Sequence, residues 1–235
     1  MTQNLTPQAT QIRALFDRIA TEYDDLNDRL SFGQHRIWKM MAVKWSNPQP
    51  GATALDLCCG SGDLAFMLAK KVGKQGKVIG LDFAIQQLEI AAKRQQKYRE
   101  LPLQWLEGDA LELPFADNYF DCGTMGYGLR NVTNIPLCLQ EIYRVLKPGA
   151  TMAVLDFHRP ESDLMNNFQQ WYLAQIVIPT ARSLNMSDEY AYLVPSLAKF
   201  PQGTQQVELA KEAGFIQPTH YPIMGGMMGV LVLKK

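Results

Sequence analysis

The chain has 235 residues, of which 47% are apolar and 20% are charged, and its 23 basic residues balance 23 acidic ones. This length suits a single α/β domain, and the composition excludes a disordered, highly charged chain. Because there is no basic surplus, we expect no nucleic-acid partner.

The first part of the chain reads as helical, and strands then alternate with helices. Residues 5–45 carry apolar side chains at helical spacing, beginning with Ile12, Leu15 and Phe16. The predicted strands are 53–57, 77–82, 103–108, 119–125 and 151–157, and the predicted helices between them are 63–72, 84–99 and 135–146. This alternation predicts a mostly parallel sheet with helices on both faces.

The last third of the chain has a different pattern. Residues 161–200 are rich in aromatic and aliphatic side chains and read as helices with no strand between them. Residues 204–215 form an amphipathic helix pattern that ends at Gly214, and residues 220–235 read as two strands joined near Gly225-Gly226. We expect these strands to add an antiparallel pair to one edge of the sheet.

The sequence shows no signs of export or of a metal centre. The four cysteines match neither a metal-binding pattern nor a disulfide framework, so we expect reduced thiols and no metal ion. The N-terminus lacks an apolar signal segment, and the apolar stretches 171–181 and 222–233 are too short for a membrane span. We therefore expect a cytoplasmic protein.

A glycine-rich turn, Gly60-Ser61-Gly62, follows the first predicted strand and opens a helix. Glycines there let the backbone approach a ligand, and the start of the helix offers unpaired N–H donors. Asp82 ends the next strand, where a carboxylate suits the two hydroxyls of a ribose. The dinucleotide fingerprint GxGxxG is absent: counted from Gly60 its last position is Ala65, and counted from position 58 its first position is Cys58.

Acidic residues at the strand ends indicate a cationic nucleoside. Asp56 would repel a pyrophosphate but would favour the ammonium and sulfonium groups of S-adenosylmethionine. Asp109 ends the third strand, where it could accept from an adenine amine, and the loop 125–131 follows the fourth strand. The carboxyl ends of parallel strands share one edge of the sheet, so these segments predict one site. A nicotinamide oxidoreductase is an alternative that Asp56 and the broken fingerprint disfavour.

Three blocks of the sequence carry a family resemblance: Tyr23–Trp38, Gly128–Val132 and Arg144–Ala150. With them the chain resembles, over essentially its whole length, the quinone-biosynthesis C-methyltransferases of the ubiquinone/menaquinone family. The resemblance implies a class I S-adenosylmethionine-dependent methyltransferase of Rossmann-like fold. That fold has a seven-stranded, mostly parallel sheet with helices on both faces and an antiparallel C-terminal strand.

Some residues depart from the common family pattern and resemble the phylloquinone branch. They are Tyr127 in the catalytic loop, Cys58-Cys59-Gly60-Ser61 in the cofactor loop and Asp156–Pro160 after the fifth strand. The implied reaction is the last methylation step of phylloquinone biosynthesis, from a phytyl (prenylated) naphthoquinol to phylloquinol. Demethylmenaquinone, a ubiquinone precursor and a tocopherol-type benzoquinol are alternative acceptors, and a cofactor-binding scaffold subunit is the non-enzyme alternative.

The strand-end positions and the resemblance together give the expected site residues. The expected cofactor-binding residues are Tyr23, Asp56, Cys59, Gly60, Ser61, Gly62, Asp82, Phe83, Asp109, Ala110 and Gly126. The expected catalytic residues are Tyr127, Arg130, Asn131 and His158. His35 and Trp38 belong with Tyr23 either to a helical cover over the cofactor or to plain helix packing.

The expected catalytic roles follow from the chemistry of the ring. An oxidised quinone carbon is electron-poor, so the acceptor must be the quinol or its quinolate. Arg130 could stabilise the quinolate oxygen, with an ion pair to a nearby carboxylate as the alternative. Asn131 could orient a water, and His158 is a candidate base, although a lone histidine is more often structural.

We expect four segments within one domain. Residues 1–50 form a helical cap, 51–160 the cofactor-binding core, 161–203 a helical insertion over the substrate, and 204–235 the completion of the same domain. The insertion supplies either core contacts or an apolar wall for an isoprenoid tail. Because such a tail lies in a bilayer, we expect peripheral docking on a membrane surface. A homodimer is also considered.

Overall fold

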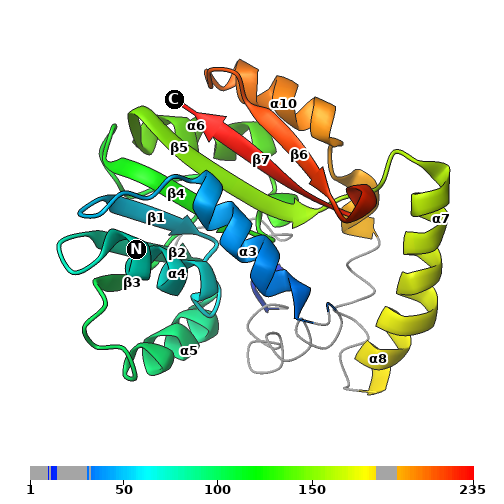
Figure 1. Cartoon of the computed structure of the whole chain (residues 1–235), viewed down its shortest axis with the longest axis horizontal. Coiled ribbons are helices and arrows are strands. Elements are labelled where there is room, and N and C mark those ends of the chain that lie inside the picture. The colour runs from blue at the N-terminus through cyan, green and yellow to red at the C-terminus, as the bar shows by residue number, and fades with distance from the viewer. Residues whose placement is uncertain (1–9, 11, 15–30, 32, 184–194) are drawn as a thin grey trace.

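The computed structural model describes residues 10, 12–14, 31, 33–183 and 195–235 (Figure 1). For residues 181–183 it describes the backbone only. The strands are β1 (Thr53–Leu57), β2 (Lys77–Asp82), β3 (Leu103–Glu107), β4 (Phe120–Gly126), β5 (Leu146–Phe157), β6 (Thr219–Ile223) and β7 (Met228–Lys234). The helices are α3 (Gln34–Trp45), α4 (Asp63–Val72), α5 (Ile85–Gln95), α6 (Ile135–Val145), α7 (Asp163–Tyr172), α8 (Ile178–Ser183) and α10 (Gly203–Glu212). Shorter helical turns are η1 (Leu129–Asn131), the π-helical η2 (Leu173–Val177) and η3 (Met224–Gly226).

Within the described residues, the strands form one sheet in the order β3-β2-β1-β4-β5-β7-β6. The first five are parallel, β7 runs antiparallel to β5, and β6 runs antiparallel to β7. This arrangement confirms the predicted mostly parallel sheet with antiparallel C-terminal strands. It also brings the carboxyl ends of β1 to β5 to one edge.

Helices cover both faces of the sheet, as predicted. In Figure 1, α3 crosses in front of the sheet and α6 lies behind it. Apolar side chains of α3 and α4, such as Val43 and Leu68, pack with Ala54 of β1 in one core cluster. Side chains of α6 and α10, such as Leu139 and Ala210, pack with a second cluster on the opposite face. The central strands are therefore buried on both sides, which explains their nearly continuous apolar sequences.

Two predicted boundaries were wrong by four or five residues. The helix predicted over 84–99 ends at Gln95, whose side chain bonds the Leu103 carbonyl and the Trp105 indole of β3, so the chain turns there to enter that strand. The strand predicted to begin at residue 151 begins at Leu146, which pairs with Phe120. The Pro148-Gly149 stop signal forms an irregularity inside β5, where Gly149 N–H donates to the Lys235 carbonyl.

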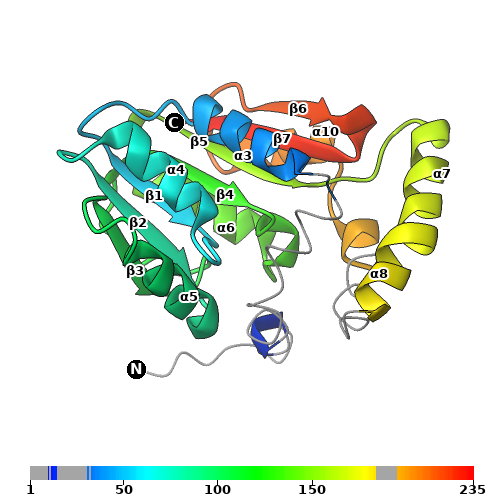
Figure 2. The ribbon, with the colours of Figure 1, turned by 60° about the horizontal axis from the view of Figure 1, so that its bottom comes forward.

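Helices α7, η2 and α8 follow one another beside the sheet and form an arm at one end of the molecule (Figures 1 and 2). A π-helical turn such as η2 is an uncommon element that often marks a functional segment. None of the helices in the described part of the chain is both long enough and apolar enough to cross a membrane. The division of the chain at residues 50, 160 and 203 stays a prediction.

Candidate active site

A pocket opens where the first four parallel strands end. The turn after β1, residues 58–61, forms one wall, and the segments after β2, β3 and β4 form the others. The predicted site residues that line it are Cys59, Gly60, Ser61, Asp82, Phe83, Asp109, Ala110, Gly126, Tyr127 and Asn131. The parallel topology thus brings together residues from four separate segments, as expected.

The glycine-rich turn is held against β2 by its backbone. Cys59 N–H donates to the Leu81 carbonyl at 3.1 Å, and Gly60 N–H donates to Asp82 Oδ2 at 2.8 Å. Gly62 has φ +92°, and a Cβ there would lie 2.5 Å from the Trp105 ring. Gly62, predicted to bind cofactor, is not among the residues that line the pocket. Its lack of a side chain instead lets the turn pack against Trp105 of β3.

Two carboxylates face the pocket in fixed orientations. Asp82 accepts from the backbone N–H of Gly60 and, through Oδ1, from that of Ala84 at 2.9 Å. Asp109 Oδ1 accepts from Leu111 N–H at 2.9 Å. Because backbone donors hold both groups, they present acceptor oxygens to a ligand without a cost of side-chain ordering.

Asp56, the third predicted acid, lies behind the pocket rather than in its wall. Its side chain is fully buried, and Oδ1 accepts from Thr124 Oγ1 at 2.9 Å. Burial raises the pKa of Asp56 to about 7, because the charged form is poorly solvated there. Any effect of this group on a ligand is therefore electrostatic and pH-dependent, not a direct contact from the pocket wall.

A charged cluster that the sequence reasoning missed lies at the start of α4. Asp63 accepts from Lys39 Nζ at 2.7 Å and from Arg94 Nη2 at 2.5 Å. Burial opposes the ionisation of Asp63, but the two cations outweigh it and lower its pKa to about 2. Lys39 and Asp63 both line the pocket. Asp63 could have been predicted from the sequence because it directly follows Gly62 of the glycine-rich turn. Lys39 was missed because it lies one residue beyond the block Tyr23–Trp38 that carries the family resemblance.

The loop after β4 is fixed by a buried ion pair. Arg130 Nη1 lies 2.6 Å from Asp156 Oδ1, and the two side chains are only 6% and 1% exposed. Arg130 Nη1 at 3.1 Å and Asn131 Nδ2 at 2.9 Å also donate to the Tyr127 carbonyl. Tyr127 has φ +60°, a left-handed conformation that these bonds stabilise. The guanidinium thus forms the ion pair that was the alternative to a contact with the acceptor.

His158 is buried in a hydrogen-bonded network outside the pocket. Its Nδ1 bonds the Asp156 carbonyl at 3.0 Å, and its Nε2 lies 2.7 Å from Gln206 Nε2 and 2.9 Å from His220 Nε2. A carbonyl only accepts, so Nδ1 carries the proton and Nε2 accepts from Gln206 and His220. Burial lowers the pKa of His158. This environment favours a positioning role over proton abstraction.

A second cavity adjoins the pocket and shares Val132 and Thr133 with it. Arg130 lines this cavity, and so do Pro195 and Phe200 from the predicted insertion. Much of its remaining surface is apolar, from Ile135, Pro136, Pro201 and Leu209. The insertion thus contributes apolar residues, together with Ser196 and Lys199, to a cavity next to the catalytic loop, and Leu173, Val177 and Leu197 to a core cluster. Its role as a wall for the tail stays a prediction.

The predicted helical cover is described only in part. Tyr23 lies outside the described residues, as does most of the block Tyr23–Trp38 that carries the family resemblance. Trp38 packs in the core between α3 and the sheet, and His35 Nδ1 bonds Ser31 Oγ at 2.9 Å. For His35 and Trp38 the packing interpretation therefore fits better than contact with a cofactor.

Comparisons with known proteins agree with this geometry. The sequence profile of the ubiE/COQ5 methyltransferase family matches residues 4–234. The chain is 59% identical, over the full length of both chains, to a 2-phytyl-1,4-naphtoquinone methyltransferase of Synechocystis sp.. It is 51% identical to a chloroplastic 2-phytyl-1,4-beta-naphthoquinone methyltransferase of Arabidopsis thaliana, covering 95% of this chain and 87% of that one.

The solved structures show the same fold. A SAM-dependent methyltransferase from Thermotoga maritima superposes with a TM-score of 0.65 at 21% identity, covering 94% of this chain and 99% of that one. The predicted fold class and the predicted resemblance are both confirmed. The chain belongs to the ubiE/COQ5 methyltransferase family.

Proposed function

We propose that this methyltransferase transfers the methyl group of S-adenosylmethionine to a ring carbon of 2-phytyl-1,4-naphthoquinol, the last methylation step toward phylloquinone. The observation that carries the proposal is the pocket with carboxylates at the ends of β2 and β3 and a glycine-rich turn after β1. The relative from Synechocystis sp., 59% identical over the full length, bears the name of that activity.

The described residues fit this cofactor. The fixed carboxylate of Asp82 suits two ribose hydroxyls, and Asp109 suits the adenine amine. Gly126 lies on the pocket wall, where a Cβ would come within 2.7 Å of Leu64 Cδ1, so the end of β4 leaves no room for a side chain. When bound, S-adenosylmethionine supplies an electrophilic methyl group on a sulfonium.

The catalytic loop is proposed to position the acceptor. Asn131 lines the pocket, and its Oδ1 is buried with no hydrogen-bond partner in the described part of the chain. We assign this oxygen to accept a hydrogen bond from a quinol hydroxyl, directly or through one water that it orients. Arg130, paired with Asp156, donates to the Tyr127 carbonyl, as Asn131 does, and so holds the loop that carries Asn131.

The second cavity is proposed to receive part of the acceptor. It adjoins the pocket at Val132 and Thr133, and the insertion residues Pro195 and Phe200 line it with apolar groups. Each tail methylene buried against such a surface stabilises binding by about 0.8 kcal/mol. This supports the interpretation of residues 161–203 as a substrate-covering segment.

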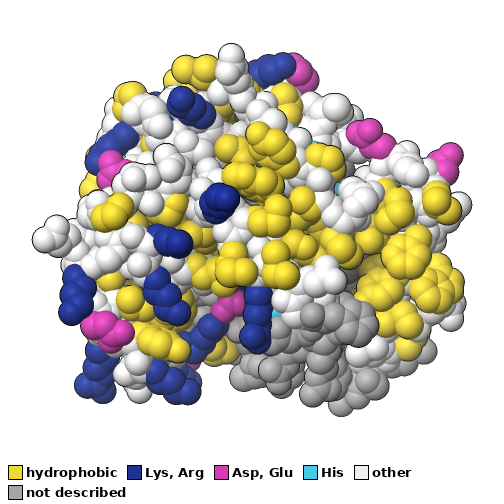
Figure 3. All heavy atoms as spheres, in the orientation of Figure 1, with side chains coloured by type: hydrophobic (Ala, Val, Ile, Leu, Met, Phe, Trp, Pro, Cys, Tyr) yellow, Lys and Arg dark blue, Asp and Glu magenta, His cyan; other side chains and the backbone are white. Residues whose placement is uncertain are grey.

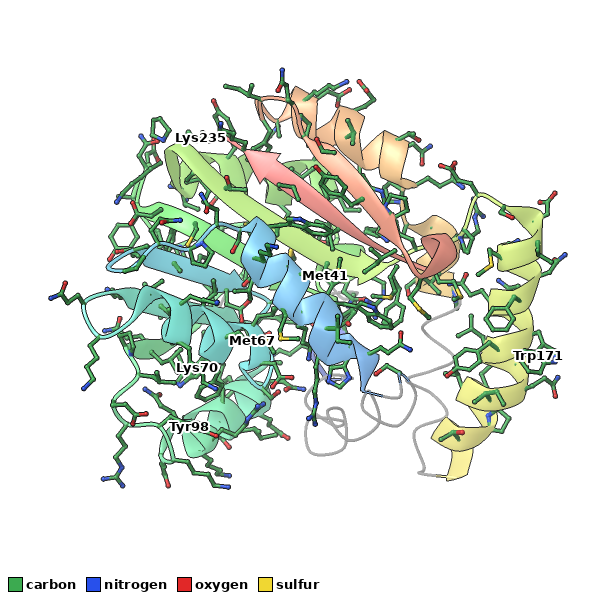
Figure 4. All side chains as sticks on the ribbon, viewed as in Figure 1. Met41, Met67, Lys70, Tyr98, Trp171 and Lys235 are labelled. Atoms are coloured by element: carbon green, nitrogen blue, oxygen red, sulfur yellow. The ribbon has the colours of Figure 1, made fainter. Side chains whose placement is uncertain are left out.

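We further propose that the enzyme docks peripherally on the bilayer that holds its acceptor. Figure 3 shows apolar side chains gathered over α3, the end of the β6–β7 hairpin and α7. Leu164, Phe168 and Trp171 of α7 are exposed, and the Trp171 side chain points away from the sheet (Figure 4). Residues 164–180 contain no charged side chain, so docking should rest on apolar contacts and persist at high salt.

Flotation with neutral-lipid vesicles, at low and at high salt, tests this docking. Replacing Leu164, Phe168 and Trp171 together by serine should release the chain from the vesicles while leaving the activity on a detergent-dispersed acceptor unchanged. Wild-type chain that stays in the aqueous fraction would contradict the docking. The homodimer stays a prediction, which light scattering of the wild type and the triple variant would test.

Turnover assays on a panel of reduced acceptors separate the proposed function from its alternatives. Phytyl naphthoquinol should be methylated faster than a ubiquinone precursor or a tocopherol-type benzoquinol. A chain that binds S-adenosylmethionine but methylates no quinol would instead support the scaffold interpretation. A chain that binds a nicotinamide dinucleotide in its place would favour the oxidoreductase.

A further inference from the structure

A lysine side chain reaches the pocket from α3, outside the strand-end loops. Lys39 is only 6% exposed, its Nζ lies 2.7 Å from Asp63 Oδ2, and it stands 5.8 Å from the centre of the Tyr127 ring. Its ammonium carries three N–H donors, and this contact with Asp63 uses one of them. A lysine this deeply buried is unusual in a protein, which makes its place in the pocket wall significant.

The charges near Lys39 differ from those in the rest of the pocket. Asp63 is shared by Lys39 and Arg94, so this cluster has one more positive than negative charge. Arg94 also donates to the Ser61 carbonyl and hydroxyl at 2.9 Å, and it is not among the pocket-lining residues. Lys39 is therefore the cation of this cluster that a ligand in the pocket meets.

The sheet topology places this cluster at one end of the pocket. Asp109 follows β3 and Asp82 follows β2, whereas Asp63 follows β1 and Tyr127 follows β4. In the strand order β3-β2-β1-β4, neighbouring strands lie about 4.8 Å apart, so β4 is roughly 14 Å from β3. An extended ligand with its nucleoside at Asp82 and Asp109 would reach the Lys39–Asp63 pair with its other end.

We propose that Lys39 and Asp63 recognise the amino-acid end of the cofactor, with Lys39 binding its α-carboxylate and Asp63 its α-ammonium. This inference rests on the proposed function. An α-amino acid is a zwitterion, so a cation and an anion side by side in the pocket wall match its two charges. The α-carboxylate of the cofactor would accept a charge-assisted hydrogen bond from the ammonium of Lys39, and such a bond is stronger than one between neutral groups.

Calorimetric titration with two ligands tests the role of Lys39. S-adenosylhomocysteine carries the amino-acid group, and 5′-methylthioadenosine has the same nucleoside thioether without it. Lys39→Gln should weaken the binding of S-adenosylhomocysteine roughly 10- to 100-fold and leave that of 5′-methylthioadenosine within about twofold. Lys39→Arg should retain most of the affinity. Lys44→Gln, an exposed lysine on the same helix, should change neither ligand.

Several outcomes would overturn this role. If Lys39→Gln weakened both ligands equally, Lys39 would only hold α3 against α4. If the wild type bound S-adenosylhomocysteine no more tightly than 5′-methylthioadenosine, the inference would fail while the nucleoside site remained. If the wild type bound neither ligand, the proposed function would fail and the inference with it. Lys39→Met keeps the apolar stem of the side chain and replaces Lys39→Gln should that variant not fold.

Discussion

The carboxyl edge of the sheet holds two groups of polar side chains that the structure uses differently. At the ends of β2 and β3, Asp82 and Asp109 are oriented by backbone donors and line the pocket. At the carboxyl ends of β4 and β5, a buried network joins Arg130, Asp156 and His158 to one another, to the backbone and to neighbouring side chains. The first group is built to bind, whereas the second is built to hold a loop in place.

The largest expected effect is in the second group. Arg130→Ala would leave the Asp156 carboxylate buried without its cation, which should lower the free energy of unfolding by about 3–5 kcal/mol. Turnover should fall about tenfold or more because the Tyr127 carbonyl loses a donor, while cofactor affinity stays near normal. Chemical denaturation and steady-state kinetics measure both effects. Unchanged stability and turnover would show that the pair does not hold the loop.

Asp82→Ala probes the first group. It should weaken cofactor binding roughly 100-fold, because it removes both the ribose acceptor and the carboxylate that fixes Gly60. Stability should change less than in Arg130→Ala, because Arg130→Ala leaves the fully buried carboxylate of Asp156 without its guanidinium. Calorimetric titration measures the affinity, with the exposed Asp117→Ala as a control. If Arg130→Ala weakened cofactor binding and Asp82→Ala did not, the binding role would belong to the second group and not to the first.

The His158–His220 pair predicts a pH dependence of stability. Burial, and then the neighbouring His158, lower the pKa of His220 to about 4, and burial lowers that of His158. Below the ordinary pKa of about 6.5 the unfolded chain therefore binds protons that the folded chain excludes. The melting temperature should fall by roughly 3–6 °C as pH drops from about 7 to about 5. The change of melting temperature with pH should be smaller in His220→Gln. An equal change in the variant and the wild type would show that the histidine pair does not cause the pH dependence.

The smallest expected effect is at Asp56. Because burial raises its pKa to about 7, the folded chain loses stability as pH rises from about 4 through 7. Asp56→Asn should therefore raise the melting temperature by a few degrees at about pH 8 and change it little at about pH 5. A pH-independent shift would show that the hydrogen bond from Thr124 dominates over the charge.

Much of the first group was predictable from the sequence, and little of the second was. Strand–helix alternation forces parallel strands, so Asp82 and Asp109 had to share an edge with the glycine turn. The Arg130–Asp156 pair joins residues 26 positions apart, and it depends on the adjacency of β4 and β5 and on the bend of one loop. His158 and His220 meet across 62 positions, only because β6 and β7 return to the sheet edge.

Lys39 shows the same limit. Its side chain meets Asp63 across 24 positions because α3 packs on α4, and no local pattern marks a helical lysine as buried. Conversely, Gly62 and His158 had the right residue types at the right strand ends, yet the structure uses them for packing and for a hydrogen-bonded network. Position along the chain predicts the edge at which a residue lies, but not which way its side chain points.

The central claim is that this enzyme methylates the reduced ring of a phytyl naphthoquinol. Incubation with methyl-labelled S-adenosylmethionine and 2-phytyl-1,4-naphthoquinone, under reducing and under oxidising conditions, tests it most directly. Labelled phylloquinol should form from the reduced acceptor and not from the oxidised one, because an electron-poor quinone carbon cannot attack the methyl group. Equal labelling under both conditions, or no labelled product from a chain that binds the cofactor, would contradict the claim.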